Sequence, residues 1–216
     1  MANWTAQRDR LVEELRREGI QDRRVLSAFS RIPRHEFVPR AARQRAYLDM
    51  ALPLAEGQTI SQPYTIAVML EALRLRPGLK VLEVGCASGY SAALMGVLVG
   101  AKGRVVSLEI IPALVRRARR NLQKVGCRNV TILQGDGSLG YPPKSPFDRI
   151  VVTAACPRIP SVLLEQLKGG GIIVAPVDAG EGQEMVKVTK MRAGLKEERL
   201  GRFLFVPLRG KYGYPP

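Results

Sequence analysis

The feature that most constrains this chain is an apolar strand pattern, a loop of small residues and an apolar run of helical length, which read VLEVGCASGYSAALMGVLV over residues 81–99. Gly85 and Gly89 bracket the loop, and glycine lets a backbone approach a ligand closely because it has no Cβ. A second buried strand pattern, RVVSLE, ends at Glu109, 24 residues after Gly85. In a strand–helix–strand unit this spacing places a carboxylate within reach of both ribose hydroxyls. The segment therefore predicts a site for a nucleoside-bearing cofactor, and so an enzyme.

The spacing within the loop separates two types of cofactor. A dinucleotide loop has the pattern G-x-G-x-x-G, which brings a pyrophosphate to a helix N-terminus. Here Ala87 stands between the two glycines, and no further glycine follows Gly89 three residues on. Glu83, beside the loop, would repel a pyrophosphate but suits the sulfonium and amino groups of S-adenosylmethionine. We therefore predict S-adenosylmethionine, with a purely structural turn as the alternative, and expect Ser88 or Ser91 to cap the helix.

The rest of the chain alternates between patterns typical of helices and of strands. We expect helices at 4–18, 22–31, 65–75, 89–99, 112–125 and 160–168, and strands at 81–84, 104–109, 130–134, 148–153, 171–177, 184–191 and 199–208. This rhythm predicts an α/β fold with a doubly wound, mostly parallel sheet, N-terminal helices and antiparallel C-terminal strands. One domain spans residues 1–216, with N-terminal helices and a substrate lid (1–78), a cofactor-binding core (79–178) and C-terminal strands (179–216). The long irregular connection over 33–63 is expected to be functional.

The net charge is the one unusual bulk property of the chain. It reaches +15, from 34 Lys and Arg against 19 Asp and Glu. Nucleic-acid binding through phosphate contacts is one interpretation. The basic run RRARR at 116–120, however, lies opposite an apolar stripe at helical spacing, so a solvated face explains it. Because no aromatic residues alternate with the charges, the pattern argues against nucleic acid as a partner.

Cysteine and histidine usage excludes several other classes. The chain has three scattered cysteines and a single histidine, His35, with no CxxC or Cys/His ligand spacing. This pattern predicts neither a disulfide framework nor a metal site. No apolar run reaches the length of a membrane span, and the N-terminus lacks the apolar core of a signal peptide. We therefore expect a cytoplasmic protein, and in the absence of a coiled-coil pattern a monomer.

Two later loops are expected to complete the cofactor site. Asp136 and Gly137 follow the predicted strand 130–134, where ligands bind in open α/β sheets. Asp136 is placed to accept a hydrogen bond from an adenine amino group, although a Gly-Asp-Gly turn is an equally good interpretation. After the predicted strand 148–153, small residues would let a substrate approach the methyl group of the cofactor.

The remaining motifs carry a family resemblance. GQTISQP at 57–63, RHEFVP at 34–39, GDG at 135–137 and VTAACPRIPSVLLEQLKGGG from residue 152 resemble the protein-L-isoaspartate O-methyltransferase family, from about Val12 to the end of the chain. The resemblance implies a Rossmann-like methyltransferase fold and a repair enzyme dependent on S-adenosylmethionine. Such an enzyme methylates the free carboxylate of L-isoaspartyl residues in damaged proteins, which are then its partners.

The resemblance also assigns site residues. Ser61 takes the position of the active-site serine, within a lid formed by Thr59, Ile60 and Gln62. The substrate peptide would be held through its backbone by Ala154, Ala155, Val206 and Pro207. The expected cofactor-binding set is Glu83, Gly85, Cys86, Ala87, Ser88, Gly89, Glu109, Ile110, Asp136 and Gly137. The chain departs from the family at Cys86, Ala87 and Ala55, where Ala87 and Ala55 replace usual glycines.

The chemistry needs no general base, since a carboxylate is already ionised near neutral pH. We expect Ser61 to orient the acceptor carboxylate by a hydrogen bond rather than to act as a nucleophile, because no Ser–His–Asp set is evident. Two alternatives remain open: a nucleic-acid methyltransferase that uses the same cofactor, and a non-catalytic binding module. Against the first, the sequence lacks an Asn/Asp-Pro-Pro-Tyr/Phe motif for attack by a base amine.

Overall fold

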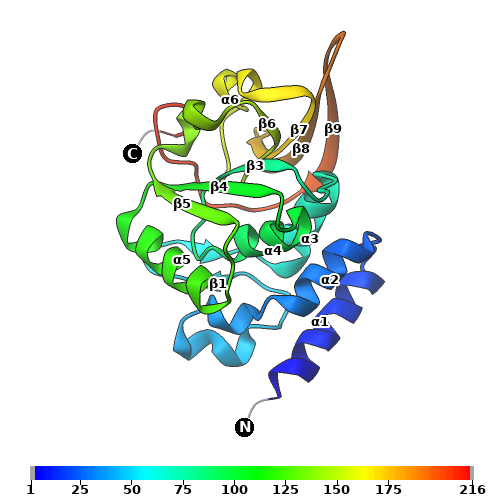
Figure 1. Cartoon of the computed structure of the whole chain (residues 1–216), viewed down its shortest axis with the longest axis vertical. Coiled ribbons are helices and arrows are strands. Elements are labelled where there is room, and N and C mark those ends of the chain that lie inside the picture. The colour runs from blue at the N-terminus through cyan, green and yellow to red at the C-terminus, as the bar shows by residue number, and fades with distance from the viewer. Residues whose placement is uncertain (1–2, 215–216) are drawn as a thin grey trace.

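In a computed structural model, which describes residues 3–214, a central seven-stranded sheet is flanked by helices (Figure 1). The strands of the sheet are β3 (Lys80–Val84), β4 (Arg104–Glu109), β5 (Val130–Gln134), β6 (Phe147–Val152), β7 (Leu167–Asp178), β8 (Gln183–Met191) and β9 (Gly194–Arg202). The helices are α1 (Trp4–Arg17), α2 (Arg23–Arg31), α3 (Pro63–Ala72), α4 (Tyr90–Val99), α5 (Pro112–Lys124) and α6 (Ser161–Glu165). None of these helices is long and apolar enough to cross a membrane.

The strand order is β5-β4-β3-β6-β7-β8-β9. The first five of these strands run parallel, whereas β8 pairs antiparallel with both β7 and β9. The predicted mostly parallel sheet with antiparallel C-terminal strands is therefore confirmed. The strand order changes direction between β3 and β6, and ligands bind outside the carboxyl ends of strands at such a switch point.

Alternate residues of the central strands face two separate apolar clusters. Val81 packs into the cluster beneath α1–α5, and its neighbour Leu82 packs into the cluster beneath α6. In Figure 1, α4 and α5 lie on one side of the sheet and α6 lies on the other. Both faces are buried, which explains why these strands are continuously apolar rather than alternating.

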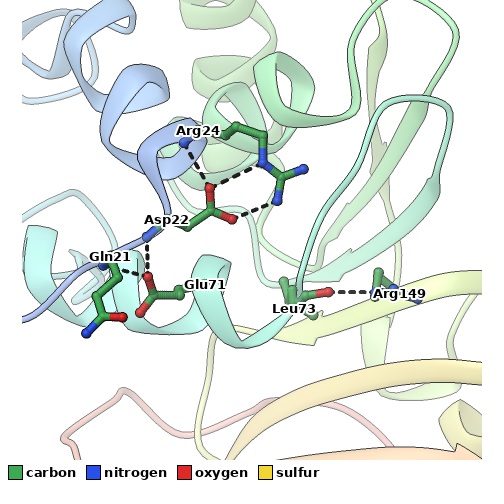
Figure 2. Close-up of polar contacts among 6 residues, drawn as sticks. All are labelled: Gln21, Asp22, Arg24, Glu71, Leu73 and Arg149. Atoms are coloured by element: carbon green, nitrogen blue, oxygen red, sulfur yellow. Dashed lines mark hydrogen bonds and ion pairs between the residues drawn. The ribbon is translucent and has the colours of Figure 1, made fainter.

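The carboxyl end of α3 is fixed both to the segment between the N-terminal helices and to the sheet. There, the carboxylate of Glu71 accepts hydrogen bonds from the backbone N–H groups of Gln21 and Asp22, at 2.7 and 2.6 Å (Figure 2). Arg149 on β6 donates to the carbonyl oxygen of Leu73, just after α3, at 2.6 Å. These contacts anchor α3, whose first residue, Pro63, is the last residue of the GQTISQP motif.

The connection over 33–63 is more ordered than an irregular loop. It contains the short 3-10 helices Arg34–Glu36 and Arg40–Arg45, and strands β1 (Leu52–Pro53) and β2 (Thr59–Ile60), which pair with each other. The ring of His35 stacks on that of Trp4, with ring centroids 4.8 Å apart, and its Nδ1 lies 2.7 Å from the Tyr47 hydroxyl. His35 is therefore a packing residue.

Three local predictions were wrong. The helix expected at 160–168 is only Ser161–Glu165, because β7 already begins at Leu167. The strand expected at 199–208 is shifted, since β9 occupies Gly194–Arg202 and completes a hairpin that extends away from the body of the molecule (Figure 1). Neither Ser88 nor Ser91 caps α4: its N-cap is Gly89, in the left-handed conformation with φ 84°, without a side-chain cap.

Candidate active site

A cavity of about 550 Å³ opens at the carboxyl ends of β3, β4 and β6, at the switch point of the sheet. Its volume lies within the range of small-molecule and cofactor sites. One wall is the loop after β3, and another is residues 58–62, which we call the flap. A third wall is residues 203–209 after β9, which we call the strap. The predicted cofactor loop and the GQTISQP motif therefore face the same space.

The loop after β3 requires its unusual backbone. Gly85 has φ +91°, and a Cβ there would lie 2.9 Å from Oγ1 of Thr153, so a side chain does not fit. Gly89 lies against α5, where an added Cβ would come within 3.2 Å of Cβ of Ala118. Ala87 also has a left-handed φ, of 46°. This conformation costs a residue with a Cβ about 1 kcal/mol and accounts for the glycine usual there.

Glu109 connects the loop to the end of β4. Its Oε2 accepts a hydrogen bond from the N–H of Ala87 at 2.9 Å, and its Oε1 accepts one from the N–H of Ile111 at 3.0 Å. Each carboxylate oxygen has a further lone pair. Because Glu109 lines the cavity, the two oxygens form a bidentate acceptor suited to a vicinal diol such as a ribose.

Glu83 lies beneath the loop rather than on the cavity wall. It is fully buried, and its two carboxylate oxygens accept hydrogen bonds from the hydroxyls of Ser91 and Ser107. Burial raises the pKa of Glu83 to about 7, against the lowering effect of these two hydrogen bonds. Any action of Glu83 on a cofactor is therefore electrostatic, through the loop backbone, or requires the loop to move.

The raised pKa predicts how stability depends on pH. In the unfolded chain Glu83 ionises near pH 4.5, but in the folded protein it stays protonated up to about pH 7. Its contribution to stability is therefore complete below pH 4.5 and is lost as the pH rises to 7. Relative to Glu83→Gln, which is neutral throughout, the wild-type free energy of unfolding is expected to fall by about 3 kcal/mol across this range. Urea unfolding of both proteins at several pH values measures the difference, and parallel curves would contradict it.

Asp136 is engaged by the C-terminal segment. Its Oδ1 accepts hydrogen bonds from the N–H and hydroxyl of Ser138, at 2.9 and 2.6 Å, and its Oδ2 accepts one from the N–H of Lys211 at 2.8 Å. Asp136 does not line the cavity, whereas its neighbour Gly137 does. The turn interpretation of Gly-Asp-Gly thus describes what Asp136 does in this structure, and adenine binding by its side chain stays a prediction.

The flap is held from behind by two side chains. Arg34 is fully buried, and its Nη2 donates to the carbonyl oxygens of Ser61 and Met50, at 3.0 and 3.3 Å. The carboxylate of Asp49 accepts hydrogen bonds from Nε2 of Gln62 at 2.5 Å and from the N–H of Tyr64 at 2.7 Å. Ser61 is therefore fixed through its own carbonyl and through the residues that follow it. Its hydroxyl makes no hydrogen bond to any of residues 3–214.

Burial lowers the pKa of Arg34 to about 10, so its guanidinium remains charged at neutral pH. The Cζ atom of Arg34 lies 5.1 Å from the centroid of the Tyr90 ring, whose face favours a cation. Tyr90 lines the cavity. A fixed positive charge therefore lies directly behind the flap.

The strap is paired to the segment after β6. Ala155 donates its N–H to the carbonyl oxygen of Val206 at 2.8 Å, and its own carbonyl accepts the N–H of Leu208 at 2.7 Å. Ala155 is fully buried and does not line the cavity, whereas Ala154, Val206 and Pro207 do. No backbone group of Ala155 is left free for a peptide, so in this structure it supports the strap.

The structure gathers most of the predicted site residues around one cavity. Those that line it are Thr59, Ile60, Ser61, Gln62, Gly85, Cys86, Ala87, Ser88, Glu109, Ile110, Gly137, Ala154, Val206 and Pro207. Glu83, Gly89, Asp136 and Ala155 lie behind it. Cys86 is buried, which raises the pKa of its thiol well above the ordinary value, so it is not a thiolate nucleophile. Residues 3–214 contain no group of three or more potential metal ligands.

The prediction from sequence missed Asp49 and the role of Arg34. Both act on the flap from the connection over 33–63, where no local periodicity marks them. Arg34 belongs to the RHEFVP motif. The only sequence signal for its role was that a charged residue stands among apolar and proline residues.

The sheet and the cavity, with a bidentate carboxylate at the end of β4 and a glycine loop after β3, are those of the class of S-adenosylmethionine-dependent methyltransferases. The model of the family "Protein-L-isoaspartate(D-aspartate) O-methyltransferase (PCMT)" matches residues 6–213. The chain belongs to this family.

Similar proteins agree with this assignment. A protein-L-isoaspartate O-methyltransferase of Methanopyrus kandleri is 51% identical over 210 residues, which cover 96% of this chain and 93% of the relative. A solved structure of a protein-L-isoaspartate O-methyltransferase has a TM-score of 0.86 at 33% identity, over 95% of this chain and 67% of that one. A putative protein-L-isoaspartate O-methyltransferase from Plasmodium falciparum, in complex with S-adenosyl-L-homocysteine, has a TM-score of 0.84 at 25% identity, over 97% and 99%.

Proposed function

We propose that this protein transfers a methyl group from S-adenosylmethionine to the free carboxylate of L-isoaspartyl residues in damaged proteins, and so initiates their repair. The names of the relatives suggest the substrate, and one geometric observation carries the proposal. Ser61, whose hydroxyl has no hydrogen-bond partner among residues 3–214, lines the same cavity as the proposed ribose acceptor Glu109. A group able to orient an acceptor and a group able to bind the cofactor therefore share one cavity.

The cavity residues fit the cofactor. Glu109 would accept hydrogen bonds from the two ribose hydroxyls, since each of its oxygens has a lone pair left after binding one backbone N–H. The loop from Gly85 to Ser88 offers close backbone approach to the amino-acid portion. Glu83 beneath it is only about half ionised at pH 7, and a cationic group nearby would favour its ionised form. Ile110 and Gly137 line the region after β4 and β5, where a base would lie. When bound, the cofactor supplies a methyl group that is already activated by a sulfonium.

The remaining task of the protein is orientation. The acceptor is a carboxylate, so no proton has to be removed before attack. The Ser61 hydroxyl would donate a hydrogen bond to one acceptor oxygen and thereby aim the other along the line of transfer. Flap and strap would exclude water, which strengthens the electrostatic interactions in the cavity. With Ala155 occupied, the contacts to the substrate backbone are expected from Ala154, Val206, Pro207 and the flap residues Thr59, Ile60 and Gln62.

A paired-peptide assay tests the proposal. Two peptides of one sequence, containing either isoaspartate or normal aspartate, are incubated with protein and radiolabelled S-adenosylmethionine. We expect a base-labile methyl ester on the isoaspartyl peptide alone. Alkali-resistant label on RNA or DNA would favour a nucleic-acid methyltransferase instead, and cofactor binding without label on either peptide would favour a non-catalytic module.

The setting of the enzyme is part of the same proposal. The chain forms one domain, because each of its three segments supplies one wall of the same cavity. Residues 1–78 contain the flap, residues 79–178 contain the loop after β3, and residues 179–216 contain the strap. We propose a monomer in the cytoplasm whose partners are damaged proteins rather than nucleic acids or membranes. Sedimentation of the purified protein tests the oligomeric state.

A further inference from the structure

The charged residues on the cavity wall are unevenly distributed. They are Glu109, at the end where the cofactor is proposed to lie, Arg202, the last residue of β9, just before the strap, and Arg209, the last residue of the strap. Both arginines are exposed. The substrate side of the cavity therefore carries only positive charge.

Neither arginine is neutralised by a carboxylate within residues 3–214. Glu184, the cross-strand neighbour of Arg202, is instead paired with Arg199, with 2.9 Å between the Oε2 and Nη1 atoms. Near Arg209, the carboxylate of Asp136 is occupied by Ser138 and by the N–H of Lys211. Both guanidinium groups are thus available to a ligand that runs along the strap.

The strap itself is rigidly placed. The side chain of Gln183 binds both backbone groups of Phe205, at 2.7 and 3.1 Å, and Ala155 binds Val206 and Leu208. Between the two arginines, Leu204 is 90% exposed and lines the cavity, so it offers an apolar contact at the entrance. Seven residue steps separate Arg202 from Arg209, so their Cα atoms lie at most about 25 Å apart, a distance that a peptide of about seven extended residues can span.

We propose that this entrance selects isoaspartyl segments with acidic side chains on both sides of the damaged residue. The inference rests on the proposed function and specifies its substrate. Ser61, Arg202 and Arg209 line the same cavity, so a peptide with its isoaspartyl carboxylate at Ser61 would bring its flanking residues toward the two arginines. There glutamate or aspartate side chains would be attracted and lysine side chains repelled. Such rim charges affect selectivity and association more than they affect the chemical step.

The inference is tested with two isoaspartyl peptides. They differ only at the positions two and three residues to either side of the isoaspartate, where one peptide carries glutamate and the other lysine. At low salt we expect the KM of the wild-type enzyme, and the Kd of fluorescently labelled peptides, to be about tenfold lower for the glutamate peptide. Raising the salt concentration should shrink this ratio, because exposed charges are screened. The double variant Arg202→Gln/Arg209→Gln should reduce it to about twofold or less.

A matched double variant controls for total charge. Arg192→Gln/Lys196→Gln removes the same two charges from the far end of the β8–β9 hairpin, outside the cavity, and should keep the tenfold ratio. Equal KM and Kd values for the two peptides in the wild type, or equal loss of the ratio in both double variants, would overturn the inference. If neither peptide is methylated, the proposed function fails, while the ratio of the Kd values still decides whether the entrance selects acidic segments.

Discussion

Replacement of Ser61 by alanine is expected to lower kcat for an isoaspartyl peptide on the order of 100-fold, while the Kd for S-adenosylmethionine changes less than about twofold. Loss of one preorganised donor at a reacting oxygen has an effect of this size. Ser61 Oγ makes no hydrogen bond within residues 3–214, so its removal should leave the fold intact. Single-turnover rates at saturating peptide and calorimetric titration of the cofactor measure the two quantities separately.

Two further variants define the role of the serine. Ser61→Thr keeps the hydroxyl and should recover part of the rate. Asp49→Ala keeps the serine but removes the hydrogen bonds that hold Gln62 and Tyr64, so Ser61 is less firmly positioned. This variant should also lower kcat, without weakening cofactor binding. If Ser61→Ala weakened cofactor binding and left kcat intact, Ser61 would be a cofactor residue and the orientation model would be wrong.

The parts of the fold that were predictable are those fixed by local pattern. Continuous apolar strands such as β3 and β4 predict a sheet buried on both faces, and the βαβ spacing predicts that they run parallel. The residues of β9, in contrast, are mostly exposed and polar, so nothing in their pattern located the strand. The apolar run FLFVPL at 203–208 led to the strand prediction instead, although it belongs to the strap, which pairs through isolated bridges at Pro207 and Arg209.

The site shows the same division. That Gly85, Glu109 and Ser61 line one cavity was predictable, because each lies in a motif that a few adjacent residues identify. Other features of the site depend on contacts between segments 27 to 75 residues apart. In these contacts the strap binds Ala155, the N–H of Lys211 binds Asp136, and Arg34 binds the carbonyl of Ser61. A single sequence carries no local signal for such contacts, and here they decide which side chains reach the cavity.

The burial of Glu83 shows why residue type alone misplaces a charge. The sequence placed a carboxylate beside the cofactor loop, but the side chains of a strand alternate between the two faces of the sheet. Glu83 faces Ser91 on α4 and Ser107 on β4, and burial keeps it protonated up to about pH 7. Glu109, in contrast, is the last residue of β4, at the carboxyl end of the strand, where both of its oxygens accept hydrogen bonds from backbone N–H groups.

Replacement of Glu109 by alanine is therefore expected to raise the Kd for S-adenosylmethionine on the order of 100-fold. Two hydrogen bonds from ribose hydroxyls to a charged acceptor are lost, each contributing about 1.5 kcal/mol or more. At saturating cofactor, kcat should fall much less than in Ser61→Ala, because the acceptor is still oriented by the flap. Titration calorimetry and kcat at high cofactor concentration test both statements.

Glu109 also binds the N–H groups of Ala87 and Ile111, so the loop itself could be disturbed by its removal. Glu109→Gln separates the two effects: its amide oxygen can still accept one N–H, but its NH₂ group can no longer accept a ribose hydroxyl. If ribose binding dominates, Glu109→Gln should weaken cofactor binding at least tenfold. Its midpoint of thermal unfolding, measured without cofactor, should be closer to the wild-type value than the midpoint of Glu109→Ala is. A Glu109→Gln variant with wild-type affinity would show that Glu109 acts only on the loop and that the ribose is bound elsewhere.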